Sequence, residues 1–181
     1  MTITVDLTQP TQATDKIIAL FQNSDIDYKH IHHDECRTSE ESQKARAEGG
    51  AGIVIGAKAI LMKIDLKQTE SQFWLFVLAG DKSIDSKSLK KSLKQKFSDF
   101  KKFRFSTAEE MAEVTNGLQP GTMPPFGKPI FADIAHLFID RSLLNHDVVG
   151  FNAACLTQSL VIPTKDYIKV AHPTDFFDFC A

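Results

Sequence analysis

The sequence has little cysteine, a single tryptophan and no strong excess of either charge. Its three cysteines, Cys36, Cys155 and Cys180, are odd in number and form no Cys-x-x-Cys pair. This argues against a disulfide framework and favours free thiols in a reducing, cytoplasmic compartment. The formal net charge is only -2, whereas a protein that wraps duplex nucleic acid usually has a strong basic excess. That class of protein is therefore disfavoured.

Long apolar runs are also missing. No stretch approaches the roughly 20 residues that a helix needs to cross a bilayer. Residues 1–6 lack the basic and apolar regions of a secretory signal. We therefore expect no membrane partner. The length of 181 residues and the hydrophobic content of 43% fit one globular domain with a sizeable core.

Helix and strand patterns alternate along the chain and predict an α/β fold with one mixed sheet. Capping boxes at residues 38–41 and 106–109 mark two helix starts. The apolar run 73–78 predicts a central strand buried on both faces. Predicted helices cover residues 14–23, 38–48, 86–97 and 106–114, with a final helical turn from Pro163. Predicted strands cover residues 28–32, 58–64, 73–78, 103–105, 129–133, 147–151 and 159–162.

The most informative segment is Gly121-Thr122-Met123-Pro124-Pro125-Phe126-Gly127, which follows Asn116-Gly117. Its glycines permit backbone angles closed to other residues, and its prolines each fix φ. A loop that is permissive at its ends and stiff in its middle can hold backbone N–H groups in one display. Such a display can bind an anion or a developing oxyanion. A rigid connection between two strands is the plainer alternative.

Possible metal ligands and a possible nucleophile gather in residues 30–36. In a strand, His30 and His32 face one way and His33 the other, and a zinc site needs further ligands from elsewhere. We therefore predict a polar strand end with no metal and no cofactor. Cys36 lies near two of these histidines, which leaves a cysteine nucleophile open. A free cysteine is, however, more often a small buried hydrophobe.

Two charged residues stand at strand ends. Lys58 begins an apolar strand directly after Gly56, and Asp81 follows another apolar strand and Gly80. The lysine either extends to solvent or points its ammonium into a cleft at the strand edge. Asp81 is either a site residue or part of a turn.

Seven lysines also cluster near the middle of the chain. Such a cluster either contacts a few phosphates or forms a solvated helix face. Its members are Lys87, Lys90, Lys91, Lys94, Lys96, Lys101 and Lys102.

Five segments, in this order, resemble motifs of the YbaK/prolyl-tRNA synthetase-associated editing domain family. They are residues 33–41, 56–61, 76–89, 105–110 and 117–127, and Gly121 and Pro125 form the defining pair of the last motif. The resemblance covers residues 25–170. It implies a single mixed-sheet editing domain with flanking helices over residues 25–181, preceded by an N-terminal helical extension over residues 1–24.

The resemblance also implies a function. It points to a free-standing aminoacyl-tRNA deacylase that acts in trans, because the sequence contains no synthetase catalytic or anticodon-binding domain. The expected substrate is tRNA(Pro) mischarged with Ala, Cys, Ser or Thr. The expected partners are the tRNA acceptor end and prolyl-tRNA synthetase.

The implied catalytic residues are Lys58, Gly121 and Pro125. Backbone N–H groups of the loop would stabilise the oxyanion, and Lys58 would anchor the phosphate or ribose of the terminal adenosine. Departures from the family pattern, at Gly56 and in residues 149–154, leave the edited amino acid open and keep a non-catalytic binding module for an aminoacyl-adenosine or a synthetase as the alternative. The implied substrate-binding residues are Thr38, Asp81, Gly117, Thr122, Met123, Pro124, Gly150 and Asn152.

Overall fold

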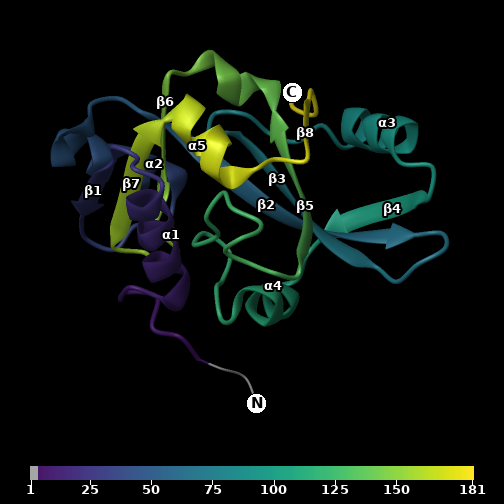
Figure 1. Ribbon diagram of the computed structural model, residues 1–181, viewed down its shortest axis with the longest axis horizontal. Helices are drawn as coiled ribbons and strands as arrows, with labels where there is room; N and C mark the ends of the chain where they lie inside the picture. Colours follow the sequence, from purple (N-terminus) through teal and green to yellow (C-terminus); the bar gives the residue numbers. More distant parts are fainter. Residues whose placement is uncertain (1–3) are drawn as a thin grey trace.

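The computed structural model describes residues 4–181, which fold around one mixed eight-stranded sheet (Figure 1). The strand order is β1-β7-β6-β2-β3-β5-β8, and β4 pairs with β2 beside this path. Three pairs, β2–β6, β3–β5 and β5–β8, are parallel, and the others are antiparallel. The predicted α/β mixed sheet is thus confirmed. The strands are β1 (Lys29–His32), β2 (Ile55–Leu66), β3 (Gln72–Ala79), β4 (Phe100–Phe105), β5 (Ile134–Asp140), β6 (Val148–Asn152), β7 (Gln158–Pro163) and β8 (Asp175–Phe177).

Threonine caps begin three of the helices. Thr38 caps α2 by accepting a hydrogen bond from the Glu41 amide, as its capping box predicts. The second predicted box begins one residue later than expected. Thr107, not Ser106, caps α4, because the Ser106 amide donates to Leu61 at the end of the β4 ladder. The helices are α1 (Gln12–Asn23), α2 (Ser39–Arg46), α3 (Ser86–Lys96), α4 (Ala108–Thr115) and α5 (Thr164–Ala171), with short turns η1 (Ala47–Ala51) and η2 (Arg141–Asn145).

Strand β3 separates two hydrophobic clusters, because alternate side chains of a strand point to opposite faces. Leu75 and Val77 belong to one cluster, and Trp74 and Phe76 belong to the other. All four side chains are buried. The prediction of a central strand buried on both faces is therefore confirmed.

Helix α1 packs into the main core. Ile17 and Phe21 are fully buried, and the Phe21 ring contacts the rings of Phe126 and Phe151 at centroid distances of 6.0 and 6.3 Å. The helix thereby packs against Phe126 of the Gly/Pro loop. The boundary predicted at residue 24, between an extension and the editing domain, stays a prediction.

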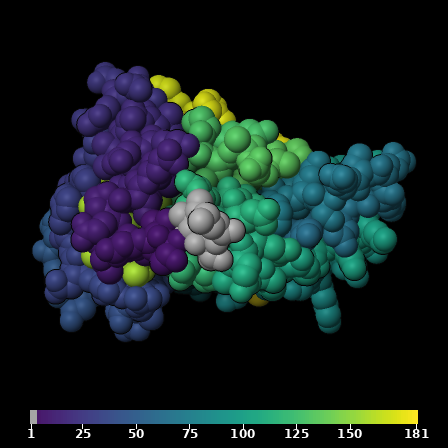
Figure 2. All heavy atoms as spheres, turned by 90° about the horizontal axis from the view of Figure 1, so that it is seen from below, coloured from purple at the N-terminus to yellow at the C-terminus, as the bar shows by residue number. Residues whose placement is uncertain are grey.

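The β2–β3 hairpin, β4 and α3 form one end of the molecule, opposite β1, β7 and α1 (Figure 1). Viewed from below, these elements, in blue and teal, extend from the rest of the molecule as a narrower part (Figure 2). We call the β2–β3 hairpin, α3 and β4 the arm. Leu89 and Leu93 attach α3 to this arm, because both are fully buried in the cluster around Trp74.

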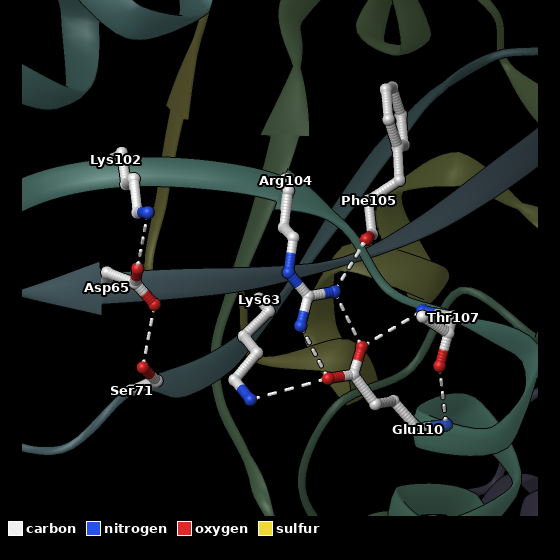
Figure 3. A network of polar contacts seen from close by, with 8 residues as sticks. All are labelled: Lys63, Asp65, Ser71, Lys102, Arg104, Phe105, Thr107 and Glu110. Carbon is white, nitrogen blue, oxygen red and sulfur yellow. Dashed lines mark hydrogen bonds and ion pairs between the residues drawn. The ribbon is translucent and has the colours of Figure 1, made fainter.

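A polar network joins the arm to α4 (Figure 3). The Glu110 carboxylate accepts hydrogen bonds from both terminal nitrogens of Arg104, at 2.7 and 2.6 Å, and from Lys63 at 3.3 Å. It also accepts from the Thr107 amide at 2.9 Å. The network fixes the start of α4, whose other end leads into the Gly/Pro loop.

The predicted strand over residues 129–133 is wrong. The amides of Ile130 and Phe131 both donate to the Gly127 oxygen, at 3.0 and 2.9 Å. This turn occupies the donors that a strand ladder would need, so β5 begins only at Ile134. The helical turn predicted from Pro163 is α5, which begins one residue later at Thr164, because Pro163 is the last residue of β7 and the N-cap of the helix. No helix within residues 4–181 is both long and apolar enough to cross a membrane.

Candidate active site

A cavity of about 280 Å³ opens where α2, β2, β6 and the Gly/Pro loop meet. Its floor is formed partly by backbone, because Gly56 of β2 and Gly150 of β6 are paired there. The Gly80 amide donates to the Gly56 oxygen at 2.7 Å, and a Cβ at residue 80 would lie 3.2 Å from that oxygen. Six of the residues predicted for the site line the cavity: Thr38, Lys58, Gly121, Met123, Gly150 and Asn152.

Lys58 and the loop lie on the same cavity. The half-buried Lys58 side chain comes from β2, and its ammonium donates a hydrogen bond to the Lys82 backbone oxygen at 2.5 Å. Gly121 and Met123 line the cavity from the loop. A lysine and two residues of the loop therefore line the same cavity.

The loop leaves only a few amides for a ligand. The two prolines have no N–H group, the Thr122 amide donates to Gln119 at 3.0 Å, and the Phe126 amide donates to Pro124 at 2.9 Å. Gly121 adopts a positive φ of 93°, which glycine tolerates. Of the amides on the cavity side, those of Gly121 and Met123 are therefore the candidate oxyanion donors.

Other predicted residues shape the loop without lining the cavity. Thr122 is buried, and its hydroxyl exchanges hydrogen bonds with the backbone of Gln119. The Pro125 oxygen accepts a hydrogen bond from the buried Tyr167 hydroxyl at 2.6 Å. Burial raises the pKa of Tyr167 far above its ordinary value, so the hydroxyl remains a donor. These contacts hold the proline-bearing turn in place.

Three further predicted residues also lie outside the cavity lining. Gly117 follows the C-cap of α4, Asn116, with a positive φ of 109° and its amide bonded to the Ala112 oxygen. Pro124 is buried within the loop, and Asp81 lies exposed in the turn after β3. A direct substrate role for these residues stays a prediction.

Sequence reasoning missed two polar residues of α2 that line the cavity. Ser42 and Arg46 stand four residues apart, so they share one face of the helix. Both are buried, with relative exposures of 3% each. The signal was present in the sequence, because Ser39–Arg46 contains no large apolar residue that would fill the buried face. Such a helix can bury only polar side chains.

The cavity is basic. Arg37, Arg46 and Lys58 line it, and its lining contains no aspartate or glutamate among the described residues. Burial lowers the pKa of Arg46 from its ordinary value of 12.5, although the group stays cationic at neutral pH. A basic cavity suits negatively charged or electron-rich oxygen atoms.

Cys36 does not line this cavity. Its sulfur lies 3.5 Å from His33 Nδ1, but burial, with Glu41 nearby, raises the pKa of the Cys36 thiol. The histidines bond elsewhere, His30 to Gln158 at 2.7 Å and His33 to Ser159 at 2.9 Å. Over residues 4–181, no group of three or more His, Cys, Asp or Glu side chains is arranged to hold a metal ion.

Comparisons with known proteins identify the family of the chain. The family model described as an aminoacyl-tRNA editing domain matches residues 33–170. The multifunctional Ser/Thr-tRNA deacylase ProXp-y of Escherichia coli strain K12 is 30% identical over 161 residues, which cover 87% of each chain.

Two solved structures share the fold. The hypothetical protein APE2540 has a TM-score of 0.67 at 18% identity, covering 92% of this chain and 99% of that chain. A protein proposed to be a trans-editing enzyme for prolyl tRNA synthetase has a TM-score of 0.67 at 15% identity, covering 96% and 99%. The present chain therefore belongs to the aminoacyl-tRNA editing domain family, and it is an aminoacyl-tRNA hydrolase.

Proposed function

We propose that the protein acts in trans on tRNA(Pro) mischarged with Ala, Cys, Ser or Thr. Serine and threonine are the first candidates, because the Escherichia coli relative is named a Ser/Thr-tRNA deacylase. The observation that supports this proposal is the shared cavity of Lys58, Gly121 and Met123. In this proposal, the loop amides contact the reacting carbonyl group of the aminoacyl ester, and Lys58 contacts the terminal adenosine.

The loop amides act on the reacting carbonyl group. Ester hydrolysis passes through a tetrahedral oxyanion, and preorganised N–H donors stabilise that charge where water is excluded. Loss of one such donor typically costs about 2.7–4 kcal/mol of transition-state stabilisation. The amides of Gly121 and Met123 therefore receive the oxyanion in this proposal.

Lys58 acts at the nucleotide end of the substrate. Its side chain lines the cavity, and its ammonium bonds to the Lys82 backbone oxygen. A phosphate or ribose oxygen of the terminal adenosine can replace or share that bond, and charge-assisted hydrogen bonds of this kind are strong. Lys58 would thereby anchor the acceptor end.

The activating base is not a protein side chain of the cavity. Among the described residues, its lining includes no histidine, aspartate, glutamate or cysteine. The substrate's own hydroxyl or side chain is left to assist the attacking water. This arrangement favours amino acids with a polar side chain.

The arm offers a docking face for the acceptor stem. Lys96 and Lys102 form ion pairs with Asp175 and Asp65, at 2.5 and 3.4 Å. The side chains of Lys87, Lys90, Lys91, Lys94 and Lys101 are exposed. A few phosphate contacts from such lysines add a modest, salt-sensitive affinity. Prolyl-tRNA synthetase is the proposed protein partner, because it would supply the mischarged tRNA.

A deacylation panel tests this proposal. Purified protein is incubated with tRNA(Pro) charged with Ala, Cys, Ser or Thr, and with correctly charged Pro-tRNA(Pro). We expect faster hydrolysis of at least one mischarged tRNA than of Pro-tRNA(Pro). Hydrolysis of none of them would refute the proposed substrate. If the protein also hydrolyses serine or threonine attached to tRNAs other than tRNA(Pro), it recognises the amino acid and not the tRNA.

A further inference from the structure

Arg46 is a buried cation without a protein counter-charge. It has a relative exposure of 3%, and its Nε atom is buried without a hydrogen-bond partner. Within residues 4–181, no carboxylate lies within 4.0 Å of its guanidinium group. Burying an ion without a partner costs several kcal/mol, so an orphaned buried arginine requires an explanation.

Unpartnered polar atoms are concentrated in one place. Four buried side-chain atoms of the described residues lack a hydrogen-bond partner, namely Ser42 Oγ, Arg46 Nε, Ser142 Oγ and Asn152 Oδ1. Three of these four, all except that of Ser142, belong to residues that line the active-site cavity. The cavity therefore presents both donors and acceptors that the protein itself does not satisfy.

The backbone makes room for the guanidinium group. A Cβ atom at Gly150 would lie 2.6 Å from Arg46 Cδ and 2.7 Å from Nε, so any larger residue there would force the Arg46 side chain to shift. A Cβ at Gly56 would lie 3.4 Å from a terminal nitrogen of the same guanidinium. Gly56 and Gly150 are paired neighbours in β2 and β6. The Arg46 side chain therefore packs against the paired glycines Gly56 and Gly150, which line the cavity.

We propose that Arg46 binds an anionic oxygen of the substrate in this cavity. The inference rests on the proposed function, which supplies the substrate. An anionic oxygen would provide the counter-charge that the protein lacks, and the absence of acidic side chains from the lining leaves nothing to compete with it. In an aminoacyl-tRNA, this oxygen belongs either to the 5′ phosphate of the terminal adenosine or to the tetrahedral oxyanion of the transition state.

Binding without turnover tests the phosphate source. The affinities of adenosine 5′-monophosphate and of adenosine are measured by titration calorimetry for the wild type and for Arg46→Met, which keeps the length of the side chain and removes its charge. If Arg46 binds the phosphate, the preference for the monophosphate falls by about tenfold or more. This measurement stands even if the protein hydrolyses none of the tested tRNAs.

Kinetics test the oxyanion source. A substrate that the wild type hydrolyses is used to measure kcat and KM for the wild type, Arg46→Lys and Arg46→Met. If Arg46 binds the oxyanion, Arg46→Met lowers kcat by about 10²–10³ and leaves KM nearly unchanged. Arg46→Lys retains part of the rate, because it keeps the positive charge. A merely structural residue would not produce this division between kcat and KM.

Control variants distinguish a failure of the Arg46 inference from a failure of the proposed function. Arg141→Met removes an exposed arginine that pairs with Asp178, and we expect no change in rate or nucleotide binding. If Arg46→Met does not fold, Gly150→Ala serves instead, because its methyl group must displace Arg46 Cδ and Nε. Folded Arg46 variants that keep kcat, KM and the monophosphate preference within about twofold of the wild type would overturn the inference. An inactive wild type would instead refute the proposed function.

Discussion

Asn152 donates a hydrogen bond from Nδ2 to the backbone oxygen of Gly121 over 3.1 Å. This bond joins the end of β6 to the Gly/Pro loop, of which Gly121 and Met123 line the cavity. The other atom of the same amide group, Oδ1, is buried without a partner and belongs to a residue of the cavity lining. Asn152 therefore holds the loop with one atom of its amide group and leaves the other atom as an unsatisfied acceptor.

We predict that Asn152→Asp raises the activation free energy of deacylation by more than it lowers the free energy of unfolding. A carboxylate cannot donate to the Gly121 oxygen, so the loop loses its tie to β6. Loss of a single hydrogen bond costs only about 0.5–1.5 kcal/mol of folding free energy. Deacylation kinetics and urea denaturation measure the two effects. The exposed Asn23→Asp at the end of α1 is the control, and equal rates for both variants would contradict this role.

Lys58→Ala should lose most of the deacylation rate. Hydrogen bonds to charged groups contribute about 1.5–3 kcal/mol, which corresponds to a loss of roughly 10-fold to 150-fold in kcat/KM. The exposed Lys169→Ala of α5 is the matched control for the loss of one lysine. Steady-state deacylation by both variants checks the expectation, and an unchanged rate in Lys58→Ala would remove the lysine from the site.

The sequence was sufficient to predict the mixed sheet and part of the site. The capping box at Thr38 and the apolar run of β3 depend on neighbouring residues, so local reasoning identified both. The strand predicted over residues 129–133 was wrong, because apolar composition does not reveal that the Gly127 oxygen accepts hydrogen bonds from the amides of Ile130 and Phe131. The resemblance, in contrast, drew attention to residues such as Lys58 that line the cavity from separate elements.

The polar composition of α2 indicates that its buried face is polar, but it does not show that Arg46 lines the cavity. An arginine near the end of a polar helix usually extends to solvent. Its burial depends on Gly56 and Gly150, which come from two other strands and meet only in the folded sheet. Contacts between distant segments of this kind are not encoded in any local pattern.

Tyr167→Phe is predicted to destabilise the protein and to slow deacylation. The substitution leaves the buried Pro125 oxygen without its donor, and an unsatisfied buried group costs about 1–3 kcal/mol. The loop then loses the contact that holds Pro125. Thermal unfolding and deacylation rates measure both effects. Tyr28→Phe, at a half-buried ring, is the control, and a similar stability for the two variants would argue against the loop contact.

Cys36→Ser is predicted to retain deacylase activity. The thiol lies outside the cavity lining, and its raised pKa keeps it protonated at neutral pH. A nucleophilic thiolate would require the opposite shift. Rates before and after treatment with a thiol-alkylating reagent provide a second measurement. A loss of activity in a folded Cys36→Ser variant would revive the cysteine hydrolase alternative.

The ion pair of Arg104 and Glu110 should make stability depend on pH. The hydrogen bonds from Arg104, followed by those from the Thr107 amide and Lys63, lower the pKa of Glu110 from 4.5 to about 2. A carboxylate with a lowered pKa in the folded state contributes stability that is complete above its unfolded pKa. That contribution is lost as the pH falls from about 4.5 towards about 2.

Arg104→Met tests this dependence. We expect the variant to be less stable than the wild type at neutral pH, and the difference in the free energy of unfolding to shrink as Glu110 becomes protonated in both proteins. Urea denaturation at neutral pH and at a pH of about 3 measures the change. Arg141→Met, which breaks an exposed ion pair with Asp178, should change stability little at neutral pH. A constant difference between Arg104→Met and the wild type at both pH values would show that Arg104 stabilises α4 by packing and not through the charge of Glu110.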